Sequence, residues 1–182
     1  MDAVVDDRAV AGLLDRVLRS AALLRQSSES REDGERVPAT SPMYRPPVPF
    51  SCSVPGKFVP GRSEILITGT PRLHAHVFVV NVKCGEDTAL HVSVRFRETN
   101  EKVVVLNTSR KGVWEKEKRH KDEFPFYQGG TFDLAIRTDY NGFNLRVNGR
   151  HHTDFPHRFK PDSIDGLEVE GDVQLHQVWF KM

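Results

Sequence analysis

The sequence has little of what marks several large classes of protein. Its only two cysteines, Cys52 and Cys84, do not form a CxxC pair, and both are interpreted as ordinary reduced core residues. No apolar run approaches the roughly 18 residues that a membrane-spanning helix needs, so no membrane insertion is expected. Lys and Arg number 26 against 25 for Asp and Glu, and this balance argues against a nucleic-acid partner.

The first residues, MDAVVDD, are acidic and lack the basic and uninterrupted apolar regions of a secretory signal. A cytoplasmic location is therefore expected. Apolar residues then recur on one face of a predicted helix: Val10, Leu13, Leu14, Val17, Ala21 and Leu24. An isolated helix of this length is marginal in water, so the apolar stripe needs a partner. That partner is either the chain's own domain or a second copy, because Val10, Val17 and Leu24 are seven residues apart.

Three segments follow from composition. Residues 1–26 form the amphipathic helical extension, and residues 27–47 are a Ser/Pro-rich linker with little to bury. Residues 48–182 contain short β-rich runs separated by turn residues, such as Asn148-Gly149. No helical period intervenes, which predicts an all-β antiparallel sandwich or barrel.

Polar residues alternate with apolar ones in two of these runs. In LHVSVRF, Val92, Val94 and Phe96 are expected in the core. The opposite face then carries a histidine, a hydroxyl and an arginine: His91, Ser93 and Arg95. In KVVVLN, Asn107 shares its face with Val103 and Val105.

The segment GVWEKEKR adds an aromatic platform and a charged pair. Glu117 and Arg119 share one strand face, but strict alternation puts Trp114 on the other. A turn or bulge must lie between them if all three are to act together. The remaining charges, Glu115, Lys116 and Lys118, are expected to keep the segment in water.

A sugar suits such a surface, because its hydroxyls both donate and accept hydrogen bonds while one ring face presents C–H groups. Charged partners strengthen these hydrogen bonds, and an aromatic ring packs on the C–H patch. In galactose that patch is continuous because O4 is axial. An equatorial O4 would leave the polar row unpaired, at a cost in free energy.

These motifs resemble the carbohydrate-recognition domain of the galectins. The family pattern His-x-Asn-x-Arg, Asn, Trp-x-x-Glu-x-Arg corresponds to His91-Val-Ser93-Val-Arg95, Asn107 and Trp114-Glu-Lys-Glu117-Lys-Arg119. Phe155-Pro156-His157-Arg158 also agrees. The resemblance covers residues 48–182 and implies a jelly-roll β-sandwich of two antiparallel sheets that binds β-galactosides, with no cofactor, metal or catalysis.

The resemblance also implies a role for each site residue. His91 and Arg95 would contact the axial O4, Asn107 and Glu117 would contact O6, and Trp114 would stack on the ring. Glu117 and Arg119 would hold a following sugar. Expected partners are β-galactoside-containing glycans and glycoproteins, with self-association through the N-terminal helix as a further expectation. Members of the family also leave the cytosol by a non-classical route.

One position departs from the family pattern. Ser93 stands where the family has Asn, and its single short hydroxyl replaces an amide. Losing one ordinary hydrogen bond would weaken binding roughly 2- to 10-fold. The alternative function is therefore a galectin-fold protein that has lost or altered galactoside binding and acts through protein–protein contacts.

Two other sites were weighed. His74 and His76 are expected on one strand face, but no further ligand joins them at zinc spacing. Glu115 and Glu117 supply the two carboxylates of a glycosidase, yet the basic residues beside them would lower both pKa values, whereas a general acid needs a raised one. No enzymatic activity is expected.

Overall fold

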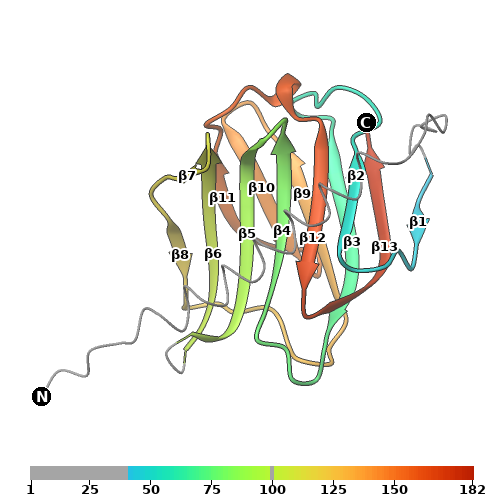
Figure 1. Ribbon diagram of the computed structural model, residues 1–182, viewed down its shortest axis with the longest axis vertical. Coiled ribbons are helices and arrows are strands. Elements are labelled where there is room, and N and C mark those ends of the chain that lie inside the picture. Colours follow the sequence, from blue (N-terminus) through green and yellow to red (C-terminus); the bar gives the residue numbers. More distant parts are fainter. Residues whose placement is uncertain (1–40, 99–100) are drawn as a thin grey trace, which may run out of the picture. The chain divides into compact units, whose positions relative to one another are not determined.

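Figure 1 shows a computed structural model of the chain, which describes residues 41–98 and 101–182. Within these residues two antiparallel β-sheets pack face to face, and the single helical element is a 3-10 turn, Pro161–Ser163. The predicted all-β jelly-roll sandwich is confirmed. The expected helix over 1–26, and the first part of the expected linker, lie outside the described residues.

The six-stranded sheet contains, in spatial order, β1 (Met43–Tyr44), β13 (Val173–Lys181), β3 (Glu64–Pro71), β9 (Phe132–Thr138), β10 (Gly142–Val147) and β11 (Arg150–Pro156). The seven-stranded sheet contains β2 (Phe50–Ser53), β12 (Gly166–Gly171), β4 (Val77–Cys84), β5 (Asp87–Glu98), β6 (Glu101–Arg110) and β7 (Val113–Trp114). Its last strand, β8 (Lys118–His120), pairs with β6 beside β7. Strands distant in sequence are thus neighbours.

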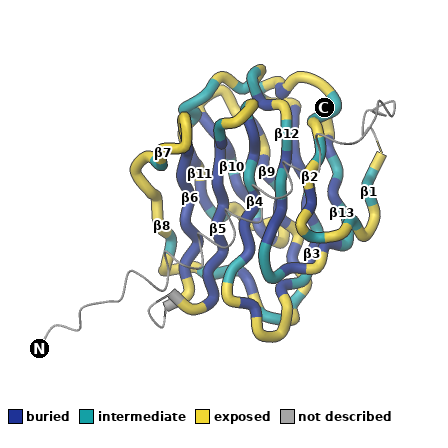
Figure 2. The backbone as a smooth tube through the Cα atoms, viewed as in Figure 1, coloured by how far each residue is buried: buried dark blue, intermediate teal, exposed yellow. Residues whose placement is uncertain are grey.

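Alternating apolar residues direct one face of each sheet into the core. In β5, Val92, Val94 and Phe96 are core residues, as predicted, and each lies next to a polar residue of the opposite face. Val104 and Leu106 of β6 are also fully buried. Figure 2 shows that this burial is continuous along the middle strands of both sheets. The sheets are therefore joined by a single hydrophobic core.

Phenylalanine rings fill one end of that core. Phe78 of β4 stacks on Phe132 of β9 with ring centroids 5.2 Å apart, and so links the two sheets. Phe126 meets both rings edge-on, at centroid distances of 5.6 and 5.2 Å. Stacked and edge-on pairs are the favoured geometries of aromatic rings. The cluster holds β4 at a fixed height above the second sheet.

Two hairpins close with two-residue turns that require left-handed backbone. Asn148 and Gly149, with φ of 51° and 76°, connect β10 to β11, as their sequence predicts. Lys111 and Gly112, with φ of 51° and 77°, connect β6 to β7. The second turn places Trp114 at the edge of the seven-stranded sheet.

Three further sequence expectations meet the structure here. Strand β1 lies inside the segment expected to be linker, and it pairs with β13. The expectation that His74 and His76 share a strand face is wrong, because β4 begins only at Val77, with His74 in a turn and His76 in the irregular segment before the strand. The two cysteines are free and pack against the core. Among the described residues, no helix is long and apolar enough to cross a bilayer.

A candidate binding site on the seven-stranded sheet

The polar row of β5 faces away from the core, at the centre of the seven-stranded sheet. His91 is directly opposite Asn107 of β6, and Ser93 is opposite Val105. Arg95 follows on the same strand and is opposite Val103. These polar residues are crowded by their neighbours, and each is at most 7% exposed. The sheet thus presents a closely packed polar row rather than a loose solvated face.

A change of register brings Trp114 to this row. In β7, Trp114 is opposite Ser109, whereas in β8, Arg119 is opposite Val105. The two pairings differ by one residue in register, so the intervening segment contains one extra residue. Trp114 and Arg119 consequently face the same side of the sheet. The irregularity on which a shared face depends is therefore present, and the Trp114 and His91 ring centroids are 4.7 Å apart.

The ring of His91 is held in one tautomer by a residue that the motif did not reveal. Its Nδ1 lies 2.6 Å from Oδ1 of Asn81, which is its neighbour on β4. An amide oxygen only accepts, so Nδ1 must carry the proton and donate it. Nε2 then keeps a lone pair, and can accept a hydrogen bond from a hydroxyl.

Burial, reinforced by the charges of Arg95 and Lys83, lowers the pKa of His91 to about 3. His91 is therefore neutral at physiological pH, and its acceptor nitrogen is preserved. The unfolded chain protonates this ring near 6.5, so it binds more protons than the folded chain between the two values.

We expect the free energy of unfolding to decrease as pH falls from about 6.5 toward 3, with His91 contributing at most about 1.4 kcal/mol per pH unit. In His91→Gln this contribution is absent, so the slope should become shallower. Urea unfolding at pH 7, 5.5 and 4.5 measures it. The same change at exposed His74 is the control, and an unaltered slope in His91→Gln would contradict the prediction.

Ser93 is engaged within the polar row. Its Oγ accepts a hydrogen bond from Nε of Arg95 at 3.1 Å, and the serine is 1% exposed. The hydroxyl therefore fixes the direction of the guanidinium, whose terminal nitrogens lie beyond Nε. Serine at this position has a positioning role that the sequence comparison with the family pattern did not suggest.

The other site residues complete the same surface. Glu117 and Arg119 form an ion pair with 2.8 Å between Oε2 and Nη1, and both are exposed. The Asn107 amide nitrogen donates to the carbonyl oxygen of Glu115 at 2.9 Å, while its Oδ1 accepts from the Thr108 N–H. The Asn107 NH2 group has a second hydrogen, which can donate to a ligand. All seven residues predicted from the sequence are brought together.

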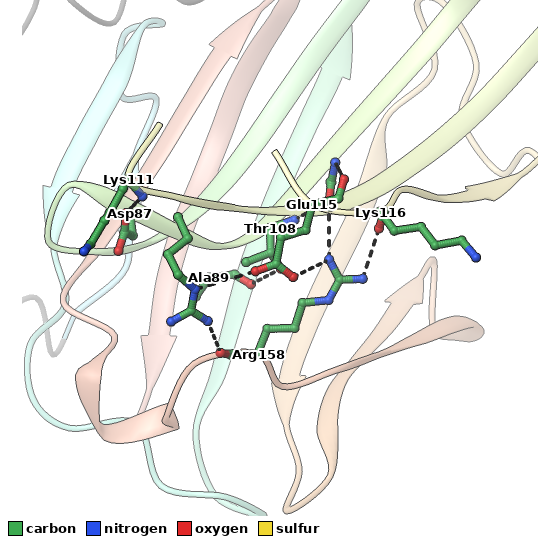
Figure 3. A network of polar contacts seen from close by, with 9 residues as sticks. Asp87, Ala89, Thr108, Lys111, Glu115, Lys116 and Arg158 are labelled. Carbon is green, nitrogen blue, oxygen red and sulfur yellow. Dashed lines mark hydrogen bonds and ion pairs between the residues drawn. The ribbon is translucent and has the colours of Figure 1, made fainter. Parts of the chain in front are cut away.

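A second set of charges, shown in Figure 3, surrounds Glu115 behind the site. One carboxylate oxygen lies 3.2 Å from Nη1 of Arg158, and the other lies 3.6 Å from Nε of Arg110. Arg158 also donates to the carbonyl oxygen of Lys116 at 3.0 Å. Glu115 is exposed to water, as expected, and it is also the centre of an ion-pair network. Arg158 was part of a recognised motif, but no role followed from its sequence.

No group of three or more His, Cys, Asp or Glu residues is arranged to hold a metal ion in the part of the chain that the structure describes. The chemistry available on this face is hydrogen bonding, charge pairing and aromatic stacking. It offers a histidine acceptor, arginine donors, a carboxylate and an aromatic ring, all oriented toward one region.

Comparison with known proteins gives a consistent result. A family model described as galactoside-binding lectin matches residues 49–180. Galectin-4 of Sus scrofa is 37% identical over 141 residues, which is 76% of this chain and 42% of that protein. A 32 kDa beta-galactoside-binding lectin of Haemonchus contortus is 37% identical over 130 residues, 71% of this chain and 44% of that protein. The chain thus matches less than half the length of these curated relatives.

Among solved structures, the galectin LEC-6 of Caenorhabditis elegans is similar, with a TM-score of 0.72 and 25% sequence identity. The match covers 80% of this chain and 99% of that one.

Proposed function

This chain belongs to the galectin family of galactoside-binding lectins, and from that premise we propose that it binds β-galactosides on the outward face of its seven-stranded sheet. The observation that carries the proposal is the one-residue register change between β7 and β8. It puts Trp114 on the same face as Arg119 and the polar row of β5. Without it the aromatic ring and the charged pair would face opposite ways.

The proposed recognition begins at the axial O4 of galactose. Nε2 of neutral His91 accepts a hydrogen bond from the O4 hydroxyl, and Arg95 donates hydrogen bonds to the O4 lone pairs. A hydroxyl that both donates and accepts satisfies these two residues together. A sugar with an equatorial O4 would not form these two hydrogen bonds with His91 and Arg95. Because both groups are buried, the loss would be costly in binding free energy.

The rest of the ring is proposed to be held from two sides. Trp114 packs on the C–H face, which is the apolar part of the sugar. The second amide hydrogen of Asn107 donates a hydrogen bond to the exocyclic O6, and the carboxylate of Glu117 accepts one from the O6 hydroxyl. Arg119, already paired with Glu117, extends toward the next sugar. Members of the galectin family are lectins rather than enzymes, and reversible binding without chemistry is the corresponding proposal here.

Glycan-bearing glycoproteins are the proposed partners. A single site of this kind binds weakly, and joining several sites increases avidity without new contacts. We propose that self-association through the apolar stripe of residues 1–26 provides such joining. A cytoplasmic location with non-classical export also remains a proposal.

The test is calorimetric titration of the full chain with lactose at 50 and 300 mM NaCl. Lactose is uncharged, so its affinity should change little with salt, whereas phosphate-mediated nucleic-acid binding would fall steeply. Cellobiose, whose O4 is equatorial, should produce no comparable heat. Equal binding of both disaccharides, or of neither, would reject the proposal.

The second candidate function is a galectin-fold protein without galactose binding, and the observation in its favour is the engagement of Ser93 with Arg95.

We expect Ser93→Asn to raise the affinity for lactose roughly 2- to 10-fold, because an amide adds a hydrogen bond that serine lacks. Ser93→Ala should lower the affinity, since the hydrogen bond from Arg95 Nε to the Ser93 hydroxyl is lost. Titration of both variants measures this. Binding only in Ser93→Asn would favour the second candidate, and unchanged affinities in both variants would exclude a role for this position.

A further inference from the structure

The backbone between β7 and β8 determines whether the site exists, because the extra residue that realigns Trp114 with Arg119 lies there. This backbone is held by three hydrogen bonds outside the regular ladder. The Glu115 N–H donates to the carbonyl oxygen of Thr108 at 2.9 Å, and the Glu115 carbonyl accepts from Asn107. The Lys116 carbonyl accepts from Arg158 at 3.0 Å.

Arg158 reaches this segment from the other sheet. It follows β11, the edge strand of the six-stranded sheet, and its guanidinium lies over the Phe155 ring, 4.7 Å from the centroid. From there Nη1 approaches both the Glu115 carboxylate and Oδ1 of Asn107, at 3.2 and 3.4 Å, while Nη2 binds the Lys116 carbonyl. One planar group thus contacts two residues of the segment, Glu115 and Lys116, and also Asn107 of β6 (Figure 3).

Arg110 fixes Arg158 from the opposite side. Its Nη2 donates to the Arg158 carbonyl oxygen at 2.8 Å, and its own guanidinium lies 4.2 Å from the centroid of the Phe159 ring. Both arginines therefore have their apolar stems and planes supported by aromatic rings, which limits their rotamer freedom. The Glu115 carboxylate lies between the two cations. These contacts connect the end of β11 in the six-stranded sheet to the segment between β7 and β8.

We propose that Arg158 is a positioning residue for the sugar site, setting Asn107 and the backbone before Glu117 so that both meet the O6 side of the bound galactoside. This inference rests on the proposed function, which assigns O6 to those two residues. Arginine is required because its planar fork contacts a carboxylate, a carbonyl and an amide in one orientation. A lysine ammonium is a point charge and can replace only part of this set.

The test compares lactose with 6′-deoxylactose, which lacks the galactose O6 hydroxyl, on the full chain. Arg158→Met should lower lactose affinity about tenfold, the loss expected for one charge-assisted hydrogen bond. Affinity for 6′-deoxylactose should change little, because that ligand does not use the braced groups. Arg158→Lys should fall between parent and Arg158→Met, and it is the second variant should Arg158→Met fold poorly. Arg146→Met, on the six-stranded sheet, is the matched control.

A uniform loss of affinity for both ligands would overturn the inference, since a purely structural effect does not distinguish them. Lactose affinity in Arg158→Met equal to that of Arg146→Met would overturn it as well. Hydrogen exchange of the Glu115 amide, measured without ligand, separates the two proposals. It should accelerate in Arg158→Met alone. A parent that binds no galactoside while this acceleration is present would overturn the proposed function and support the bracing of the segment by Arg158.

Discussion

Replacing Trp114 with alanine should lower the affinity for lactose by about 30-fold or more, which corresponds to roughly 2 kcal/mol, the threshold for a binding hot spot. The indole is the only large apolar surface in the proposed site, and its ring lies against His91. Its removal therefore takes away the stacking platform and also opens one side of the histidine to water. Calorimetric titration with lactose measures the loss directly.

The chain contains a matched control for this variant, because its second tryptophan lies on the other sheet. Trp179 lies between the core residues Val178 and Phe180 and so faces outward, with the Lys181 ammonium 5.1 Å from its ring centroid. Trp179→Ala should leave lactose affinity within twofold of the parent, as expected when no contact with the ligand is lost. If the two variants bind alike, the sugar does not stack on Trp114.

Replacing Phe78 with alanine should reduce the free energy of unfolding by about 3–5 kcal/mol, which is a large share of the roughly 5–15 kcal/mol available to a domain. Phe78 is completely buried and touches phenylalanine rings from both sheets, Phe96 of β5 and Phe132 of β9. The rings around it cannot all move inward to fill the space. Removing it should therefore leave a cavity, and the loss of stability grows with cavity volume.

Urea unfolding monitored by circular dichroism measures this change. Tyr127→Ala, at a side chain that is 65% exposed, is the control and should shift stability by less than about 0.5 kcal/mol. Phe78 is paired with Val94, which lies between Ser93 and Arg95 on β5. Lactose affinity at 10 °C is therefore a second measurement, because a shift of β5 would also move the proposed binding residues. A loss of stability below 1 kcal/mol would mean that the two sheets do not depend on this cluster.

The strands that sequence patterns predicted were those with long apolar runs. LHVSVRF and KVVVLN alternate clearly, and both form central strands with the predicted faces. Strands β11 and β12 were not predicted, since RHHTDFP is mostly polar and GLEVEG begins and ends in glycine. Their pairing with neighbouring strands, rather than their own propensity, makes them strands. Tertiary context commonly decides short strands in this way.

The site was predictable to the extent that it is encoded in short motifs. Parity showed that Trp114 could share a face with Glu117 and Arg119 only if a turn or bulge lay between them, and the two registers contain one. The groups that orient the motif residues were not predictable. Asn81 selects the His91 tautomer from the neighbouring strand, and Arg158 reaches Glu115 from the other sheet. Neither is near its target in sequence, and a polar residue in isolation does not reveal its hydrogen-bond partner.

The partial burial of Cys52 makes its rate of alkylation a measure of how often the strand around it opens. This thiol belongs to β2, the edge strand of the seven-stranded sheet, and burial raises its pKa to about 12. Alkylating reagents attack the thiolate, so the folded strand should react very slowly at neutral pH. The reaction should be faster whenever β2 separates from β12 and the thiol becomes fully exposed to water. Alkylation rates, followed by mass spectrometry, would therefore report how often this edge opens in the intact lectin, and whether a bound glycan lengthens the interval.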